Sequence, residues 1–502
     1  MYSFLPQALR GLRERCSEEG HKRMIARLIA ILYALAVLCL SAYGLHAWVL
    51  TVLYWRYRRR FTPASPVPRD RLPRVTVQLP LYNEAHVAAR LIDAAAALDY
   101  PRDRLEIQVL DDSTDETVQI VDRRVAFHRR QGVDIRVLRR SERDGFKAGA
   151  LARGLEEARG EFIAIFDADF CPRSDFLLRT VPHLMAHPEV GLVQARWTHL
   201  NTDYSLLTRV QALALDGHFV VEQTARSRAG LLMHFNGTAG VWRRSCIEES
   251  GGWQSDTLCE DLDLSYRAQI GGWRLLYLPE VEEPAELPPQ ILAFKRQQAR
   301  WAQGATQCLR KLSVPLVRSP RLSPFQKAMG LLHLSGYMAY PLMILLLLLT
   351  PLLVLHPDAS WGPLRLLAPA CLGPLLVYAT SQRALYPDWI RRLWVLPFLI
   401  LVGTGVAWNN TLAVLRGLIR WGGEMKRTPK FRLEGREGRW DRSRYRLRRD
   451  RGVVGEVGLA LYALAAAVLA GRLGDGGLLP FLLLYGAAFG LVAGMSLWEM
   501  TR

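Results

Sequence analysis

The pattern of hydrophobic and polar positions divides the chain into a membrane part at each end and a soluble part between them. An apolar run covers residues 24–53 and ends in the aromatic and basic stretch WRYRRR. The run is long enough to cross a hydrocarbon core of about 30 Å, and it is too long for a signal peptide and lacks a small-residue cleavage site. We therefore expect a retained membrane helix within residues 1–61, a Pro-rich linker at 62–73 and a soluble domain at 74–311.

Within the soluble domain, short β-rich runs alternate with segments of helical spacing. We expect strands at residues 75–82, 105–113, 135–138 and 161–169, and helices at residues 85–98 and 147–159. Strands that alternate with helices form a mostly parallel sheet with helices on both faces. The predicted fold class is therefore α/β, of the Rossmann-like type, in which ligands bind beyond the carboxyl ends of the strands.

Apolar blocks return after the soluble domain. They cover residues 329–355, 364–378, 393–408, 453–470 and 478–498. The third block is short and contains Pro397, Gly403 and Gly405, which suits an interfacial or re-entrant segment better than a full span. We therefore expect five true spans, counting the one near the N-terminus.

Charge orients these spans. The chain has 502 residues and a net charge of +18, and half of that excess lies in residues 416–451, with 14 basic and 5 acidic side chains. Basic loops beside membrane spans face the cytosol. We therefore expect membrane helices at 312–415, a cytosolic basic loop at 416–452 and two further helices at 453–502. Five spans then place the N-terminus on the extracytoplasmic side.

The same charge distribution argues against nucleic acid as a partner, because the basic side chains are concentrated beside the membrane and the soluble domain carries acidic clusters at predicted strand ends. The seven cysteines show no CxxC spacing, so neither a zinc site nor a disulfide framework is expected.

Two acidic clusters follow predicted strands. DAD, Asp167 to Asp169, offers two carboxylates of the kind that bridge Mg²⁺ or Mn²⁺ to substrate phosphates, or acids that cap a helix. DDS, which begins with Asp111 and Asp112, offers acceptors for a nucleobase or ribose and also suits the N-cap of the helix that follows. Both clusters lie where a parallel sheet binds its ligand.

Downstream motifs add a cation, a base and an aromatic surface. Lys147 lies among small residues that admit a diphosphate, although the same pattern fits a solvated lysine. Asp261 is the candidate general base, with Glu260 and Asp263 equally eligible by composition. Trp301 and Trp253 offer faces for sugar rings, or simply pack in the core or at the membrane interface.

The block QQARW completes the set. Gln297 and Arg300 are three residues apart and therefore share one face of a helix, and Arg300 can pair with a phosphate. Acidic strand ends, then QxxRW, then apolar spans, indicate sugar transfer from a nucleotide donor beside a membrane.

On these motifs the chain resembles glycosyltransferase family 2, the inverting, processive membrane synthases with a GT-A fold. It looks closest to the plant cellulose-synthase-like A and C proteins, which are mannan and glucan synthases, and to their bacterial relatives. The matching segments are QLPLYNE, QVLDDSTDET, FKAGAL, FDADF, FNGTAGVWR, GGW, EDLDL and QQARW, and KRTPK is similar to the V-T-x-K gating loop of cellulose synthases. Arg427 stands there in place of Val, and Pro429 is extra.

The resemblance implies roles for individual residues. Donor binding is implied for Glu84, Asp111, Asp112, Lys147 and Asp167, and the metal, Mg²⁺ or Mn²⁺, for Asp167 and Asp169. Asp261 would be the catalytic base. Acceptor and pyrophosphate binding is implied for Asn236, Gly237, Trp253, Gln297, Arg300 and Trp301, and closure over the donor for Thr428 and Lys430.

We therefore expect a processive enzyme that polymerises a β-linked hexose (mannan, glucomannan or glucan) from GDP-mannose or UDP-glucose and passes the chain through its membrane helices. The alternative is a glycolipid synthase that adds one or a few sugars to a membrane lipid; a non-catalytic scaffold that merely binds nucleotide sugars is a third reading, opposed by the complete set of acids. The expected location is the inner or plasma membrane, with a cytosolic catalytic domain. The expected partners are the nucleotide-sugar donor, the growing glycan and the bilayer, with a homo-oligomer or an accessory secretion subunit left open.

Overall fold

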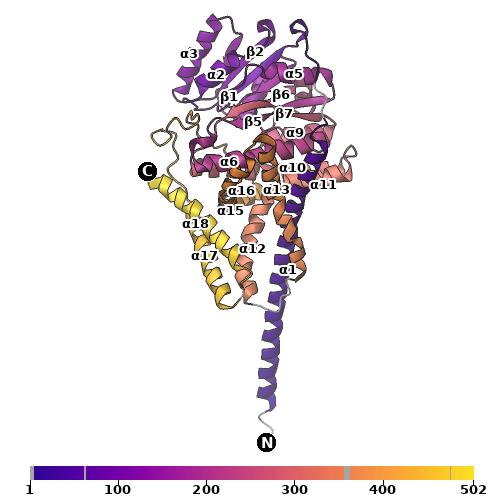
Figure 1. Ribbon diagram of the computed structural model, residues 1–502, viewed down its shortest axis with the longest axis vertical. Coiled ribbons are helices and arrows are strands. Elements are labelled where there is room, and N and C mark those ends of the chain that lie inside the picture. The colour runs from indigo at the N-terminus through magenta and orange to yellow at the C-terminus, as the bar shows by residue number, and fades with distance from the viewer. Residues whose placement is uncertain (1–4, 61–63, 356–361, 475, 502) are drawn as a thin grey trace.

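A seven-stranded sheet in the order β3-β2-β1-β4-β6-β5-β7 forms the centre of the soluble domain, which lies at the top of Figure 1. The computed structural model describes residues 5–60, 64–355, 362–474 and 476–501. The strands are β1 (Val75–Leu81), β2 (Leu105–Asp111), β3 (Ile135–Leu138), β4 (Phe162–Ile165), β5 (Val190–His199), β6 (Gly240–Arg243) and β7 (Arg274–Ala285). The first four are the strands predicted from the sequence, and they pair in parallel. Only β6 is reversed, since it runs antiparallel to both β4 and β5.

Helices cover both faces of the sheet, as the alternating pattern predicts. Those of the soluble domain are α2 (Ala88–Ala96), α3 (Thr117–Arg130), α4 (Phe146–Glu157), α5 (Phe176–Ala186), α6 (Leu206–Asp216), α7 (Thr224–Arg228), α8 (Arg244–Glu249), α9 (Glu260–Gly271) and α10 (Ile291–Arg318). One apolar core joins α2, α3 and α5 to the sheet, and a second core joins α4, α8 and α9 to it. Burial of these apolar faces is the main stabilising contribution to the domain.

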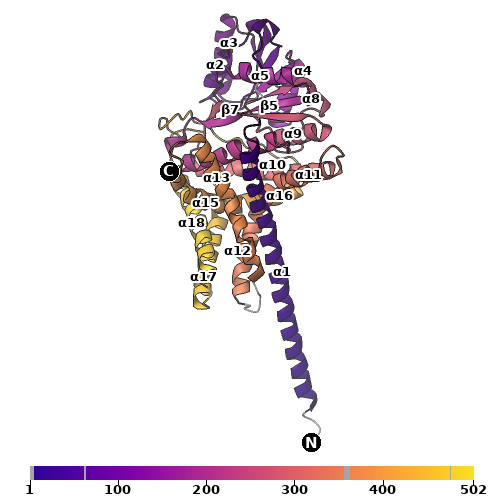
Figure 2. The ribbon, with the colours of Figure 1, turned by 45° about the vertical axis from the view of Figure 1, so that its right-hand side comes forward.

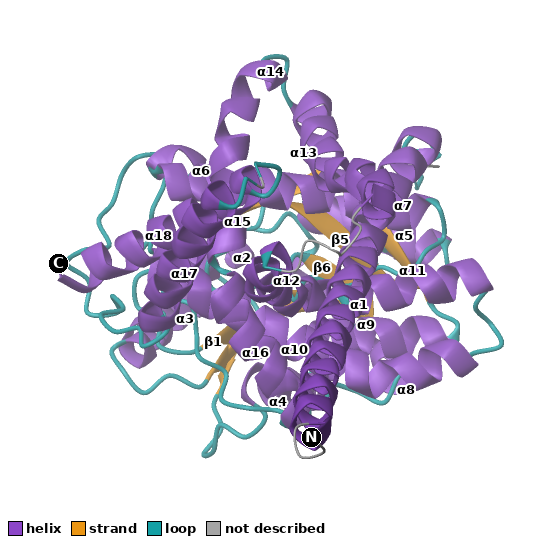
Figure 3. Ribbon diagram, turned by 90° about the horizontal axis from the view of Figure 1, so that it is seen from below, coloured by secondary structure: helices purple, strands orange, loops and turns teal. Residues whose placement is uncertain are grey.

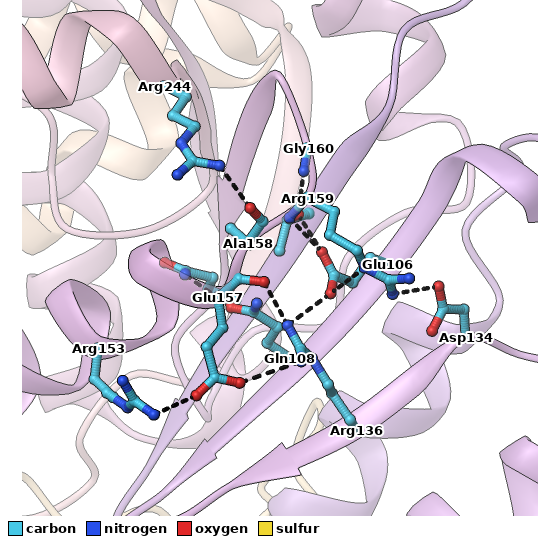
Figure 4. Close-up of polar contacts among 12 residues, drawn as sticks. Glu106, Gln108, Asp134, Arg136, Arg153, Glu157, Ala158, Arg159, Gly160 and Arg244 are labelled. Carbon is cyan, nitrogen blue, oxygen red and sulfur yellow. Dashed lines mark hydrogen bonds and ion pairs between the residues drawn. The ribbon is translucent and has the colours of Figure 1, made fainter.

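A buried carboxylate lies near the amino end of β2, away from the strand ends where ligands are expected (Figure 4). Glu106 is fully buried. Its carboxylate accepts hydrogen bonds from the Thr76 hydroxyl at 2.7 Å and from the Arg159 backbone N–H at 2.9 Å. It also pairs with the Arg136 guanidinium at 2.9 Å and with the Arg159 guanidinium at 3.0 Å. The charge is thus matched by donors on both oxygens, which is the condition under which a buried carboxylate is tolerated.

Long helices extend below the soluble domain. They and the shorter helices between them are α1 (Leu5–Tyr57), α11 (Pro324–Leu334), α12 (Ala339–Val354), α13 (Leu372–Leu385), α14 (Trp389–Arg392), α15 (Leu396–Gly405), α16 (Ala407–Ile419), α17 (Val453–Arg472) and α18 (Leu479–Thr501). Four stretches within the described residues are long and apolar enough to cross a membrane: Met24–Tyr57, Gly336–Val354, Val453–Arg472 and Leu479–Thr501. Seen from below, α17 and α18 lie on one side of α12 and α1 on the other (Figure 3). These helices mark the chain as a membrane protein.

Two of the predicted apolar blocks do not form one continuous helix across the membrane. The block at residues 364–378, expected as a full span, is divided between a 3₁₀ stretch, Gly362–Cys371, and α13. Pro369 and Pro374 explain the division, since proline lacks the N–H that a continuous α-helix needs. The block at residues 393–408 ends at a bend of 44° between Trp389–Gly405 and Ala407–Ile419, a geometry that fits a broken span or a re-entrant loop.

The ends of the long helices define two sides of the membrane part of the protein. The N-terminal end of α1 points away from the soluble domain and its C-terminal end meets that domain, whereas the C-terminal end of α18 lies near the domain (Figures 1 and 2). The basic loop between α16 and α17 also contacts the domain, for example through the Gly422 N–H, which donates to the Asp256 carbonyl at 2.7 Å. The arrangement places the basic loop and the soluble domain on one side, and the start of α1 on the other.

Candidate active site

A cavity open to solvent lies at the carboxyl ends of β1, β2 and β4; its enclosed space and the open space adjoining it together amount to about 1100 Å³. Most of the residues predicted from the sequence line it. They are Glu84, Asp112, Lys147, Asp167, Asp169, Asn236, Gly237, Asp261, Gln297, Arg300, Trp301, Thr428 and Lys430. Asp111 and Trp253 are the two predicted site residues that do not line it.

The two carboxylates of the DDS cluster lie in different places: Asp111 is buried, and Asp112 faces the cavity. Asp111 is buried at the end of β2, where its side chain accepts from Arg139 Nε at 2.9 Å and from the Ser113 N–H at 3.1 Å. Asp112 lines the cavity and is held by Arg140 through two contacts, Nη2–Oδ2 at 2.5 Å and Nε–Oδ1 at 3.1 Å. Asp112 therefore faces the cavity, whereas Asp111 supports the turn behind it.

The DAD cluster is paired with two lysines from distant parts of the chain. Lys147 Nζ lies 2.5 Å from Asp167 Oδ1, and Lys430 Nζ lies 2.6 Å from Asp169 Oδ2. Burial by itself lowers the pKa of Lys147, but the carboxylates of Asp167 and Glu260 raise it above its ordinary value. The ammonium group is therefore charged at neutral pH and available to a phosphate.

The donor set fits a divalent cation only together with a substrate. The described residues contain no group of three or more His, Cys, Asp or Glu side chains that could hold a metal ion. Mg²⁺ and Mn²⁺ are commonly bound by one or two carboxylates plus substrate phosphates. Asp167 and Asp169 supply two such carboxylates in a cavity large enough for a diphosphate, so these residues fit a metal that arrives with a nucleotide.

Asp261 lies in the first turn of α9 and reaches the cavity beside Gly237. A Cβ placed on Gly237 would be 2.9 Å from Asp261 Oδ2, and its φ of +83° also requires glycine. No ion pair involves Asp261 in the part of the chain that the structure describes. Burial and the neighbouring Glu260 raise the pKa of Asp261 to about 7, against the opposing charges of Lys147 and Arg300. A carboxylate with a pKa near neutrality suits a general base.

The structure separates the three acids of EDLDL, which composition left equally eligible. Glu260 and Asp261 line the cavity, but Asp263 does not. Asp263 is fully buried and pairs with Arg267 at 2.8 Å and with Lys311 at 3.0 Å. Its charge is satisfied inside the fold, which leaves Glu260 and Asp261. Glu260 lies 3.8 Å from Lys147 Nζ, whereas Asp261 has no ion pair among the described residues, so Asp261 is the stronger candidate base.

The QQARW block lies on α10, which crosses beneath the cavity. Gln297, Arg300 and Trp301 all line the cavity. One turn later, a Cβ on Gly304 would be 2.4 Å from Cys259 Sγ and 2.8 Å from the Cys259 nitrogen. Glycine at this position lets α10 approach the segment that carries Asp261, so that both motifs reach the same cavity.

The two predicted tryptophan surfaces have different environments. Trp301 is partly exposed in the cavity. Trp253 is buried in the core beneath the sheet, with its ring edge-on to Trp242 at a centroid distance of 6.2 Å. The structure therefore places Trp253 in the core, which was the alternative role for a lone tryptophan.

The KRTPK segment of the basic loop lines the cavity opposite the strand ends. Besides the pair between Lys430 and Asp169, Arg427 Nη1 lies 3.2 Å from Glu84 Oε2. Burial raises the pKa of Glu84 to about 8, although the charges of Arg427 and Lys430 oppose the shift. Thr428 is buried against the cavity, and its hydroxyl has no hydrogen-bond partner among the residues that the structure describes. The loop thus contributes side chains to the site in this arrangement.

Sequence reasoning missed several cavity residues. Arg143 stacks over the ring of Tyr82, with its guanidinium carbon 3.4 Å from the ring centroid, and both line the cavity. Met425, Arg427 and Trp197 line it as well. Tyr82 lies inside the QLPLYNE motif and Arg427 inside KRTPK, so the motifs were a signal for these two. No local pattern marked the others.

Comparisons with known proteins agree with this geometry. Residues 73–304 match the profile described as "Glycosyltransferase like family 2". "Probable glucomannan 4-beta-mannosyltransferase 7" of Oryza sativa subsp. japonica is 40% identical over 368 residues, which cover 72% of this chain and 62% of that protein. "Glucomannan 4-beta-mannosyltransferase 2" of Arabidopsis thaliana is 42% identical over 313 residues, which cover 60% of this chain and 59% of that protein. The chain spans about six-tenths of the length of these relatives.

Among solved structures, the mannosyltransferase PcManGT from Pyrobaculum calidifontis, in complex with GDP-Man and Mn²⁺, is similar to this chain. The TM-score is 0.51 and the sequence identity 26%, over 77% of this chain and 99% of that one.

Proposed function

From the membership of residues 73–304 in the glycosyltransferase like family 2, and from their GT-A type fold, we propose that the protein is a membrane-bound β-mannan synthase. It transfers mannose from GDP-mannose, with inversion, to the end of a growing glycan. The relatives named as glucomannan 4-beta-mannosyltransferases and the neighbour that holds GDP-mannose and Mn²⁺ support mannose over glucose as the donor sugar.

One observation carries the proposal, namely that a single cavity brings together the residues to which the proposal assigns the base, the diphosphate site and the acceptor surface. Asp261 lines it with a pKa raised to about 7, the carboxylates of Asp167 and Asp169 line it with Lys147, and Trp301 adds an apolar ring. A protein that only binds nucleotide sugars would not need, beside the diphosphate site, a carboxylate whose pKa is raised to near neutrality.

Each part of the cavity has a proposed role. Asp112 binds the nucleoside of the donor, while Lys147 and Arg300 bind the diphosphate. Asp167 and Asp169 would hold a divalent cation, Mg²⁺ or Mn²⁺, which would supply positive charge to balance that of the departing nucleotide.

On the acceptor side, Trp301 provides the face for the terminal sugar ring. Asp261 takes the proton from the acceptor hydroxyl as this oxygen attacks the anomeric carbon from the side opposite the nucleotide. The configuration at that carbon is therefore inverted.

The membrane part extends the proposal to the path of the product. The soluble domain and the basic loop face the cytosol, where nucleotide sugars are made. The enzyme resides in the inner or plasma membrane. Lys430 and Thr428 close the basic loop over the donor, and the glycan leaves through the membrane helices. The side on which the basic loop lies in Figure 1 supports this orientation.

The test uses the purified full chain in detergent, supplied separately with radiolabelled GDP-mannose, UDP-glucose, UDP-galactose and UDP-N-acetylglucosamine in Mn²⁺ or Mg²⁺. The proposal expects a polymer from GDP-mannose that endo-β-1,4-mannanase degrades, and loss of synthesis with EDTA. A product soluble in organic solvent would favour the glycolipid synthase. Incorporation from UDP-glucose alone would overturn the choice of donor.

A further inference from the structure

A group of polar side chains, of which Gln223 is fully buried and the others are partly buried, surrounds Asn236, a cavity residue, and plays no part in the scheme above. It consists of His218, Glu222 and Gln223 from the π-helical turn Gly217–Gln223, together with His234 and Asn236 itself. We call these five residues the histidine relay. A π-helical turn is uncommon and occurs often at functional sites, and here it provides three of the five side chains.

The orientation of the relay follows from one backbone carbonyl. The side-chain nitrogen Nε2 of Gln223 lies 2.8 Å from the His234 carbonyl oxygen, which can only accept a hydrogen bond. The atom at this end of Gln223 must therefore be the NH₂ group. The same nitrogen lies 2.8 Å from the Asn236 side chain, so the Asn236 atom that faces it must be the oxygen Oδ1.

The Asn236 NH₂ group then faces the two imidazoles. Its nitrogen lies 3.0 Å from His218 Nε2 and 2.9 Å from His234 Nε2. Both ring nitrogens must accept, so both histidines are neutral and carry their proton on Nδ1. Burial lowers the pKa of His234 well below its ordinary value, which agrees with a neutral ring.

Glu222 fixes the tautomer of His218. The His218 Nδ1–H donates to Glu222 Oε2 at 3.0 Å. The Glu222 oxygen must accept this hydrogen bond, because Nδ1 carries the proton. Glu222 thereby holds the proton on Nδ1 and leaves Nε2 free to accept, as carboxylates do behind other functional histidines.

One chemical property of the site results from this chain of contacts. Both hydrogens of the Asn236 NH₂ group are used within the relay, so the only capacity that the side chain has left is a lone pair on Oδ1. Asn236 lines the cavity next to Gly237, which itself lies against Asp261. The side chain therefore offers the cavity a hydrogen-bond acceptor, and a sugar hydroxyl is the complementary donor.

We propose that Glu222, His218, His234 and Gln223 are positioning residues that fix the Asn236 side-chain oxygen as the acceptor for a hydroxyl group of the incoming glycan end, close to the base. The inference rests on the proposed function and deepens it, because it assigns the atom that reads the acceptor sugar. The other four residues of the relay act through Asn236 and do not line the cavity themselves.

The test is a double-mutant cycle on acceptor affinity, measured by calorimetry with β-1,4-mannohexaose in the absence of donor. Asn236→Ala and His218→Leu should each weaken binding about tenfold, which is the worth of one hydrogen bond. The double variant should also lose about tenfold, because His218 acts only through Asn236. Glu222→Gln should stay within about threefold of wild type, since the amide oxygen still accepts from His218 Nδ1–H.

The control is His46→Gln. His46 on α1 accepts from Arg226 at 3.0 Å and touches the same buried region, but it forms no hydrogen bond to Asn236 among the described contacts, so mannohexaose affinity should not change. GDP-mannose affinity should be unchanged in all variants. Independent losses that multiply to about a hundredfold, or single variants that bind like wild type, would overturn the relay.

The proposed function can fail without affecting this result. If the wild type binds mannohexaose but takes mannose from no donor, the enzyme assignment is wrong while the cycle still reports on the relay. If the wild type prefers cellohexaose, the same cycle is run with that probe. Absence of binding to both oligosaccharides would overturn the relay as a reader of the acceptor.

Discussion

Two carboxylates near opposite edges of the same sheet, Glu106 and Asp261, have opposite environments: Glu106 is fully buried, whereas Asp261 is partly exposed in the cavity. Glu106 receives donors on both oxygens from Thr76, Arg136 and Arg159. Burial by itself would raise its pKa, but these partners lower it below the ordinary value. Asp261 accepts the Leu262 N–H at 2.8 Å and has no ion-pair partner in the described part of the chain, and its pKa is raised to about 7.

The difference separates a structural carboxylate from a reactive one. A group whose charge is matched by fixed donors holds its proton weakly and stabilises the fold, whereas a group left without a partner is ready to take a proton. The acids that pair with lysines, Asp167 and Asp169, lie between these cases, because under the proposed function a diphosphate with its cation would take the place of the lysine partners.

The largest expected effect comes from removing the unpaired carboxylate. Asp261→Asn should lower transfer from GDP-mannose by about 10³-fold, as expected for loss of a general base. Since Asp261 has no ion pair to lose, the apparent melting temperature should stay within about 2 °C of wild type. Labelled-sugar incorporation and thermal unfolding of the same preparation measure the two quantities.

The matched control is Asp263→Asn, two residues away on α9. Asp263 is paired with Arg267 and Lys311 and faces away from the cavity. This variant should lose stability yet keep activity per folded molecule within about threefold of wild type. The reverse outcome, a stable but inactive Asp263→Asn, would assign the base to the wrong acid.

The next largest effect is expected from neutralising Glu106, the carboxylate whose charge is paired. Glu106→Gln should destabilise the fold by about 2 kcal/mol, a value discounted because Arg136 and Arg159 are partly exposed. A lowered pKa gives stability that is present above the ordinary value of 4.5 and is lost as the pH falls through the lowered one. The gap in melting temperature between variant and wild type should therefore narrow below pH 4.5, and a gap that widens there would contradict the pairing.

A smaller effect is expected from removing Lys430, the lysine that pairs with Asp169. Lys430→Met removes the partner of Asp169 and one contact of the basic loop with the cavity. We expect the KM for GDP-mannose to rise about tenfold, roughly the worth of one charge-assisted hydrogen bond, with little change in melting temperature. Arg432→Met is the control, as Arg432 lies in the same loop, is exposed and does not line the cavity. Equal effects of both variants would indicate that only loop charge matters.

The smallest effect on activity is expected at Trp253. Trp253→Phe should leave the acceptor KM within about twofold of wild type and lower the melting temperature, since the ring packs on Trp242 in the core. Trp301→Phe, the cavity counterpart, should raise the acceptor KM several-fold with little loss of stability. A larger rise for Trp253→Phe would return this residue to the acceptor site.

Much of the fold could be predicted because its signals are local. β1, β2, β3 and β4 each follow a β-rich run, and the acids that end two of them lie at the sheet edge where the cavity forms. The α/β fold class and the family resemblance are confirmed. The reversed strand β6 was not predicted, since only pairing with β4 and β5 determines its direction.

The rest depends on contacts between distant segments. Lys430 reaches Asp169 across 261 positions. The relay joins a π-helical turn to a loop, and of its side chains only Asn236 belongs to a motif. The core position of Trp253 likewise depends on Trp242 and not on the GGW motif. Sequence spacing determines which residues share a helix face or a strand end, but not which loop closes over them.

The most direct measurement of the central claim is the pH dependence of kcat/KM for mannose transfer by wild type and Asp261→Asn. The raised pKa means that Asp261 is protonated below about pH 7 and cannot accept the acceptor's proton there. The wild-type rate should therefore rise about tenfold per pH unit and level off above about pH 7, whereas the residual rate of the variant should show no such inflection. An inflection near pH 7 that persists in Asp261→Asn would show that another group is the base.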